Sequence, residues 1–188
     1  MSEPKTLLEA VRHFSDLNVC HAHMVALKWP DGAVKCPSCG GDKIGLIQSR
    51  RLLQCGNVEC RRQFSAKVGT IFEDSPLGLD KWFVAVWSIA NAKNGISSCE
   101  LARAIGVQQK TAWRMQHVIR CAMESRTFRK FNGEEAFADL LGKLAQIPKE
   151  EAGAVFAQKF PAAAKRMRPK KRKKADLAWQ DLKQTNSL

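Results

Sequence analysis

Four of the seven cysteines lie in two close pairs, a spacing that suits metal binding. Cys36 and Cys39 form the first pair and are followed by Gly40, whereas Cys55 and Cys60 form a second, wider pair. Zn²⁺ accepts four thiolates in a tetrahedron, and paired ligands separated by a short gap are the usual way to supply them. We therefore expect a structural zinc site whose ligands are the thiolates of Cys36, Cys39, Cys55 and Cys60.

Two alternatives to this assignment stay open. Disulfide bridges would need an oxidising compartment, and the start of the chain lacks the apolar run that is typical of secretion. His21 and His23 precede the first pair and are alternative ligands, but four thiolates already complete a structural site, so we expect both histidines on a helix surface. The remaining cysteines have no partner at ligand spacing and are interpreted as small core or surface thiols: Cys20, Cys99 and Cys121.

The cysteine pairs need short strands to hold them, and alternating apolar residues predict three. Residues 43–48 and 51–54 predict two strands around a polar turn, and the alternation of Phe64, Ala66 and Val68 predicts a third. Together they predict a zinc ribbon over residues 34–72. Because so few apolar residues cannot build an ordinary core, the metal must stabilise this part, by roughly 10–16 kcal/mol as in comparable small zinc peptides.

Helical periodicity dominates the rest of the chain. Before the ribbon, residues 5–18 carry an apolar stripe and residues 20–28 predict a short second helix, which makes residues 1–33 an N-terminal helical segment. Far behind the ribbon, residues 132–162 predict a helical C-terminal segment, in which Pro148 suits the first turn of a helix.

Between these segments, residues 76–126 predict three helices. Gly95 ends the first, a capping box formed by Ser97 and Glu100 opens the second, and Gly106 ends the second. A short glycine-containing turn before the third helix is typical of a helix-turn-helix. The predicted fold is therefore a small zinc ribbon of short antiparallel strands plus a mainly α remainder, with a three-helix helix-turn-helix unit and a helical and basic, disordered C-terminal region.

The third of these helices, which we expect over residues 108–125, separates into two faces at about 100° per residue. One stripe is apolar and is predicted to face the core: Ala112, Met115, Ile119 and Met123. The opposite side is cationic and hydrogen-bonding: Lys110, Arg114, His117 and Cys121. In a major groove Arg can grip guanine and Gln can grip adenine, so the predicted DNA-reading residues are Gln108, Gln109, Lys110, Thr111, Trp113, Arg114 and His117. A solvated face without a partner is the alternative, and Trp113 could equally belong to the core.

The last part of the chain, residues 163–188, begins with a strongly basic block. Such a block repels itself, and we expect it to be disordered until it meets phosphate. The predicted phosphate-binding residues are Lys165, Arg166, Arg168, Lys170, Lys171, Arg172, Lys173 and Lys174. The same composition also fits a nuclear-localisation signal.

The charge of the whole chain indicates an anionic partner. The 188 residues include 31 Lys and Arg against 18 Asp and Glu, a net charge of +13, which favours nucleic acid. No run approaches 18 uninterrupted apolar residues, so we expect no membrane span. We expect a cytoplasmic protein associated with the nucleoid, with DNA as its main partner and Zn²⁺ as its cofactor.

Several short motifs, in order, resemble the zinc-ribbon and helix-turn-helix region at the N-terminus of bacterial insertion-sequence transposases. The resemblance covers about residues 14–123 and rests on the runs at residues 29–32, 36–40, 60–65, 69–72, 82–83, 95–97, 100–102 and 110–115. In that family these two parts recognise the ends of the mobile element. The resemblance therefore implies zinc and DNA binding.

The resemblance also implies a separate nuclease domain with three acidic residues that hold two Mg²⁺, and here the chain departs from it. The residues after Met123 are predicted to form helices and a basic tail, with no strands to array carboxylates such as Glu134 and Glu135. We therefore expect DNA binding without catalysis. Two alternatives stay open: a partial transposase that acts in trans with a full-length copy, and a module that binds RNA or protein. Besides DNA, a full-length transposase or a second copy of this chain is a candidate partner.

Overall fold

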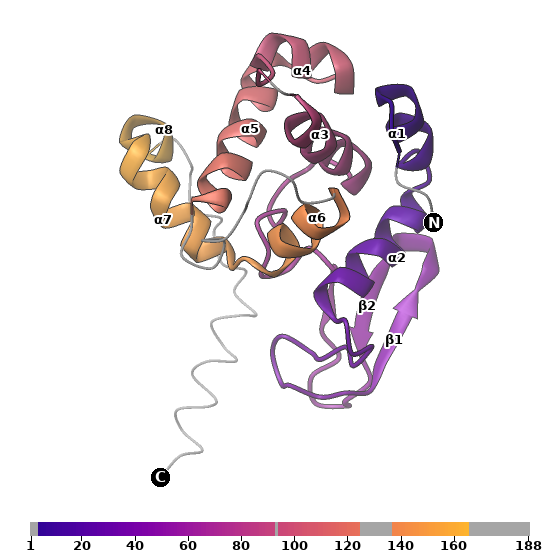
Figure 1. The fold of residues 1–188 in the computed structure, drawn as a ribbon. Helices are drawn as coiled ribbons and strands as arrows, with labels where there is room; N and C mark the ends of the chain where they lie inside the picture. Colours follow the sequence, from indigo (N-terminus) through magenta and orange to yellow (C-terminus); the bar gives the residue numbers. More distant parts are fainter. Residues whose placement is uncertain (1–3, 93, 125–136, 166–188) are drawn as a thin grey trace. The chain divides into compact units, whose positions relative to one another are not determined.

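The computed structural model describes residues 4–92, 94–124 and 137–165 (Figure 1). The chain divides into two units, Met1–Phe156 and Ala157–Leu188. None of the helices in the described ranges is long and apolar enough to cross a membrane. In chain order the helices and strands are α1 Leu7–His13, α2 Leu17–Lys28, β1 Ile44–Ile47, β2 Leu52–Cys55, β3 Gln63–Phe64, α3 Leu79–Asn91, α4 Ser98–Ile105, α5 Gln109–Met123, α6 Phe137–Gln146, α7 Lys149–Lys159 and α8 Pro161–Lys165.

The two N-terminal helices differ in their bounds from the prediction. The first helix ends at His13, because Asp16 opens a new helix by accepting a hydrogen bond from the backbone N–H of Asn18 at 2.7 Å. The predicted apolar stripe is only partly buried. Phe14 is in the core, whereas three other members are at least 40% exposed: Leu7, Leu8 and Val11.

Three antiparallel strands form the ribbon in the order β1-β2-β3, as the sequence predicts. The register pairs Ile44 with Cys55 and Leu53 with Phe64. The third strand is only two residues long, so the prediction that Ala66 and Val68 continue it is wrong. The chain turns away after Phe64, and the Lys28 ammonium group donates to the carbonyl oxygens of Ala66 and Val68.

A helical core lies beside the ribbon, and α3 is its central element. This helix contacts α1, α2, α4, α5 and α6, and Phe83 and Val86 on it are fully buried. The helix starts at Leu79 rather than at residue 76, where the predicted three-helix region begins. Ser75 accepts a hydrogen bond from the Trp82 indole N–H at 3.0 Å, so it fixes the ring that fills the core.

The helix α6 completes the same core from a distant part of the sequence. It packs against α2, α3 and α5, and Leu140, Leu141 and Leu144 on it are at most 2% exposed. Just beyond it, Pro148 forms an isolated β-bridge with Thr70, and the backbone N–H of Lys149 donates to the carbonyl of Gly69 at 3.3 Å. The connector between ribbon and α3 is thus held by residues that follow α6.

This packing makes a testable prediction about α6. Leu144→Ala should lower the free energy of unfolding by about 2–5 kcal/mol, because it opens a cavity in a shared core. Gln146→Ala is the matched control, since Gln146 is exposed on the same helix. Urea unfolding monitored by tryptophan fluorescence measures both, and equal midpoints for the two variants would contradict the shared core.

Candidate metal centre and nucleic-acid interface

The four predicted ligands meet at one point of the ribbon. The Sγ atoms of Cys36, Cys39, Cys55 and Cys60 all lie within 4.8 Å of one another, with Cys36–Cys60 at 3.7 Å and Cys39–Cys55 at 3.5 Å. Zn–S bonds of about 2.3 Å in a tetrahedron place sulfur atoms about 3.8 Å apart, whereas a disulfide holds them at about 2.0 Å. The cluster therefore has the dimensions of a tetrathiolate metal site and not of two disulfides.

Two turns of the same kind carry these ligands. In the first, the backbone N–H of Gly40 donates to the carbonyl of Cys36 at 2.9 Å, and in the second the N–H of Arg61 donates to the carbonyl of Asn57 at 2.9 Å. Each of these N–H groups belongs to the residue after a ligand, and each residue has a positive φ, 71° for Gly40 and 39° for Arg61. The two turns point both cysteine pairs at one centre.

The electrostatics of the cluster require a cation. Burial raises the pKa of the Cys36 thiol, but hydrogen bonds from the backbone of Cys39 and Ser38 outweigh burial and hold that pKa at about 7. At Cys55 a backbone hydrogen bond from Asn57 favours the thiolate, yet burial and the neighbouring thiols outweigh it and raise the pKa to about 12. Like charges this close cannot all form unaided, so four thiolates here need a divalent cation between them.

Left-handed backbone at Arg61 is a feature that the sequence reading missed. A non-glycine residue in this conformation costs about 1–2 kcal/mol, and glycine adopts it freely. Arg51, at the end of the β1–β2 turn, shares it with φ 51°. The signal was present in the sequence, because Arg61 follows the second cysteine pair as Gly40 follows the first.

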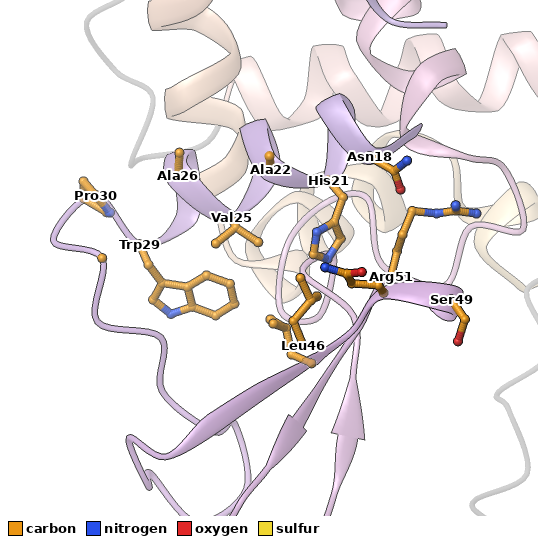
Figure 2. Close-up of a pocket in the computed structure, with 13 residues that line it drawn as sticks. Asn18, His21, Ala22, Val25, Ala26, Trp29, Pro30, Leu46, Ser49 and Arg51 are labelled. Carbon is orange, nitrogen blue, oxygen red and sulfur yellow. The ribbon is translucent and has the colours of Figure 1, made fainter. Parts of the chain in front are cut away.

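A groove of about 980 Å³ separates α2 from the β1–β2 hairpin, and Trp29, Val25 and Leu46 line its apolar part. Figure 2 shows the His21 ring pointing from α2 towards the hairpin, and Arg51 reaching back from the hairpin. His21 is only 8% exposed, and its Nε2 atom has no hydrogen-bond partner within the described ranges. The expectation of a surface histidine is therefore wrong for His21, because the hairpin covers it.

Neither candidate histidine joins the thiolates. The metal-ligating cluster found in the described part of the chain contains cysteines only. His23 lies on α2 with its ring 5.9 Å from that of His13. Cys20 and Cys121 are buried thiols, and Cys99 is exposed.

The helices α4 and α5 pack against each other across a three-residue turn. Ser97 caps α4 by accepting from the backbone N–H of Glu100 at 3.1 Å, and Gly106 ends it with φ 63°. The predicted core stripe of α5 is confirmed for Ala112, Met115 and Ile119, which are at most 2% exposed.

The opposite side of α5 is exposed only near its N-terminal end. Gln108, Gln109, Lys110 and Arg114 are exposed, whereas Thr111, Trp113 and His117 are half-buried. The prediction that Cys121 faces outward is wrong, because α3, α4 and α6 all pack on α5 and leave Cys121 2% exposed.

Contacts divide the predicted DNA-reading residues into two groups. The Trp113 ring lies 4.3 Å from the His117 ring and 6.5 Å from the Phe156 ring of α7, so these aromatic side chains face one another. The Gln109 amide donates to the Ser98 hydroxyl of α4 at 2.8 Å, which ties the start of α5 to α4. Lys110 and Arg114 are exposed cations near the start of the helix. Of the predicted phosphate-binding tail, Lys165 ends α8, and residues 166–174 lie outside the described residues.

Comparison with known proteins agrees with the chemistry of the ribbon. Residues 16–63 match the transposase zinc-ribbon domain. A stretch of 94 residues is 34% identical to an uncharacterized protein in the transposable element ISH50 of Halobacterium salinarum. That stretch is 48% of this chain and 30% of the relative, so the chain spans less than a third of the relative's length. No solved structure matches the chain. Together these findings support a transposase-type zinc-ribbon region in the N-terminal part of the chain.

The cluster geometry predicts one zinc ion per chain. Protein purified without chelator should contain it, and Cys55→Ser should lose it together with the amide-exchange protection of β1 and β2, because the ribbon has little other core. Cys99→Ser is the control, since Cys99 is an exposed thiol outside the cluster. Elemental analysis gives the metal content, and a wild-type preparation without zinc would contradict the site.

The buried histidine predicts a pH dependence of stability. Burial, followed by the positive charge of Arg51, lowers the pKa of His21 below its ordinary value near 6.5. As the pH falls below about 6.5, His21 is protonated in the unfolded chain but stays neutral in the folded chain. The free energy of unfolding therefore falls. His21→Phe should flatten this slope in urea unfolding between pH 6.5 and the pH at which zinc is lost. An unchanged slope at unchanged metal content would contradict it.

Proposed function

We propose that this protein is a zinc-dependent DNA-binding protein of transposase type. In this proposal Cys36, Cys39, Cys55 and Cys60 hold Zn²⁺, and α4 and α5 act as a helix-turn-helix whose second helix reads the major groove. The observation that carries the proposal is the exposed, cationic start of α5 in a chain that also carries a transposase-type zinc ribbon. The zinc has a structural role, because four thiolates leave no open coordination position for a reaction.

The reading residues follow from exposure and from the chemistry of the groove. Arg114 can donate two hydrogen bonds to the O6 and N7 atoms of guanine, and Gln108 can pair with adenine. Lys110 offers a single positive charge that suits a phosphate. Trp113 and His117 face each other and Phe156, so we assign them to positioning α5 and not to base contact.

The basic tail contributes affinity in this proposal. Eight positive charges at Lys165–Lys174 would release counterions from any duplex, and this effect does not depend on sequence. If all eight engaged, the slope of log K against log salt concentration would steepen by at most roughly 7 units. Affinity and specificity would thus come from different parts of the chain.

A second candidate function is participation in DNA transposition together with a full-length transposase. The similarity to a protein in a transposable element favours it. Mg²⁺-dependent nicking of a labelled element end, measured with and without a full-length transposase, separates the two candidates. Nicking only when both proteins are present would support the second one.

The proposed groove contact predicts a base-selective loss. A binding site is first selected from random duplexes, and Arg114→Ala should then weaken binding by about 1–3 kcal/mol while relaxing the preference at one or two base pairs. Neutralising Lys170, Lys171, Arg172, Lys173 and Lys174 should instead weaken all sequences alike and lower the salt dependence.

Fluorescence anisotropy on selected and random duplexes measures both effects. Arg103→Ala on α4 is the control, because it removes one exposed charge from the neighbouring helix. Equal losses on selected and random DNA from Arg114→Ala would argue against base reading, and binding to RNA without any affinity for duplex DNA would overturn the proposed function.

A further inference from the structure

We propose that Arg61, together with Gln54 and a glycine-lined hollow, is a phosphate-binding site through which the ribbon contacts the backbone of duplex DNA. This inference rests on the proposed function and deepens it, since it assigns a second contact that is independent of α5. Arg61 was not among the predicted DNA-binding residues.

The first argument is the conformation that Arg61 adopts. The two ligand turns have the same hydrogen bond and the same left-handed closing residue, yet the first uses Gly40 and the second uses Arg61. Gly40 shows that the turn closes without any side chain at this position. Glycine at this position would relieve the backbone strain. We therefore explain the arginine by a ligand that its side chain binds.

The second argument is that this side chain is available. Arg61 is exposed, and within the described ranges its guanidinium group has no hydrogen-bond partner and no carboxylate within 4.0 Å. Its neighbour Arg62 behaves differently, because one of its guanidinium nitrogens donates to the Ser38 hydroxyl at 2.6 Å. Arg62 therefore ties the two ligand turns together, whereas Arg61 leaves all its side-chain donors to a ligand.

The third argument is the shape beside Arg61. A hollow of about 310 Å³ lies between Arg61 and the hairpin, and Gly45, Gln54 and Gly56 are part of its lining. Gly45 carries no side chain to obstruct a strand of sugar and phosphate, and the nearest atom to a Cβ added there would be the Gln54 carbonyl oxygen, at 4.0 Å. The half-buried Gln54 amide adds a donor, and phosphate oxygens accept from both guanidinium and amide groups.

Charge selects an anionic polymer as the occupant. Residues 34–72 carry seven Lys or Arg against two acidic residues, Asp42 and Glu59. Neither Asp42 nor Glu59 lines the hollow. A phosphodiester backbone would neutralise the charge of Arg61 and would also be attracted by the other cations of the ribbon. We therefore propose duplex DNA as the partner.

The test uses the full-length zinc-loaded protein and a random-sequence duplex. Arg61→Gly should keep the turn and the zinc, because glycine suits the left-handed conformation, but it should make the slope of log K against log salt about one unit shallower. Arg61→Lys keeps the charge and should retain most of the slope. Arg12→Ala removes one exposed charge from α1 and should leave the slope unchanged.

The outcomes separate this inference from the proposed function. An unchanged slope for Arg61→Gly, in a series where Arg114→Ala still weakens the selected site, would overturn the Arg61 site alone. Loss of zinc from Arg61→Gly at a chelator concentration that wild type survives would also overturn it, because Arg61 would then serve the metal. A larger loss on single-stranded RNA than on duplex DNA would reject DNA as the occupant, and wild type that binds no duplex would overturn both proposals.

Discussion

The convergence of four cysteine sulfur atoms on one point is the constraint on which the ribbon depends. Two candidate ligands are among the four buried members of the hydrophobic cluster inside the ribbon, which are Cys36, Leu53, Cys55 and Phe64. A cluster this small cannot offset the entropy of ordering the chain around it. Folding of the ribbon would therefore be coupled to binding of a metal at the cluster, and the side chains that the hairpin presents would be positioned only in the metal-bound form.

Trp29 and the connector join the ribbon to the helical core. The Trp29 side chain packs against both hydrophobic clusters, and the ammonium group of the adjacent Lys28 bonds to the carbonyls at the end of the ribbon. Fully buried Phe72 continues the connector into the core, where its ring lies 5.3 Å from that of Trp82. The ribbon is thus docked on the helices through several contacts and does not hang from a free linker.

The sequence predicted correctly those features that depend on residues close together in the chain, such as ligand spacing and helix caps. Cysteine spacing identified the ligands, and capping chemistry located the start of α4 at Ser97. Errors came where distant segments decide burial. Cys121 follows the outward side of a helical wheel, yet α6 and the other helices around α5 bury it; His21 was expected at a surface, yet the hairpin covers it. The burial of these two side chains could not be predicted from one sequence, because it depends on which distant segment packs over them.

The docking of the ribbon also bears on how two weak contacts could act together. One arginine at a phosphate and a few side chains in a groove each contribute little at physiological salt. If both lie on one rigid body, binding at the first holds the second near its site, and the entropy of association is lost only once. Removing the metal would then weaken binding through α5 as well, although no zinc ligand touches that helix. Such a loss would show that the ribbon and α5 act together on one duplex, because a reader that used α5 alone would bind as well without the metal.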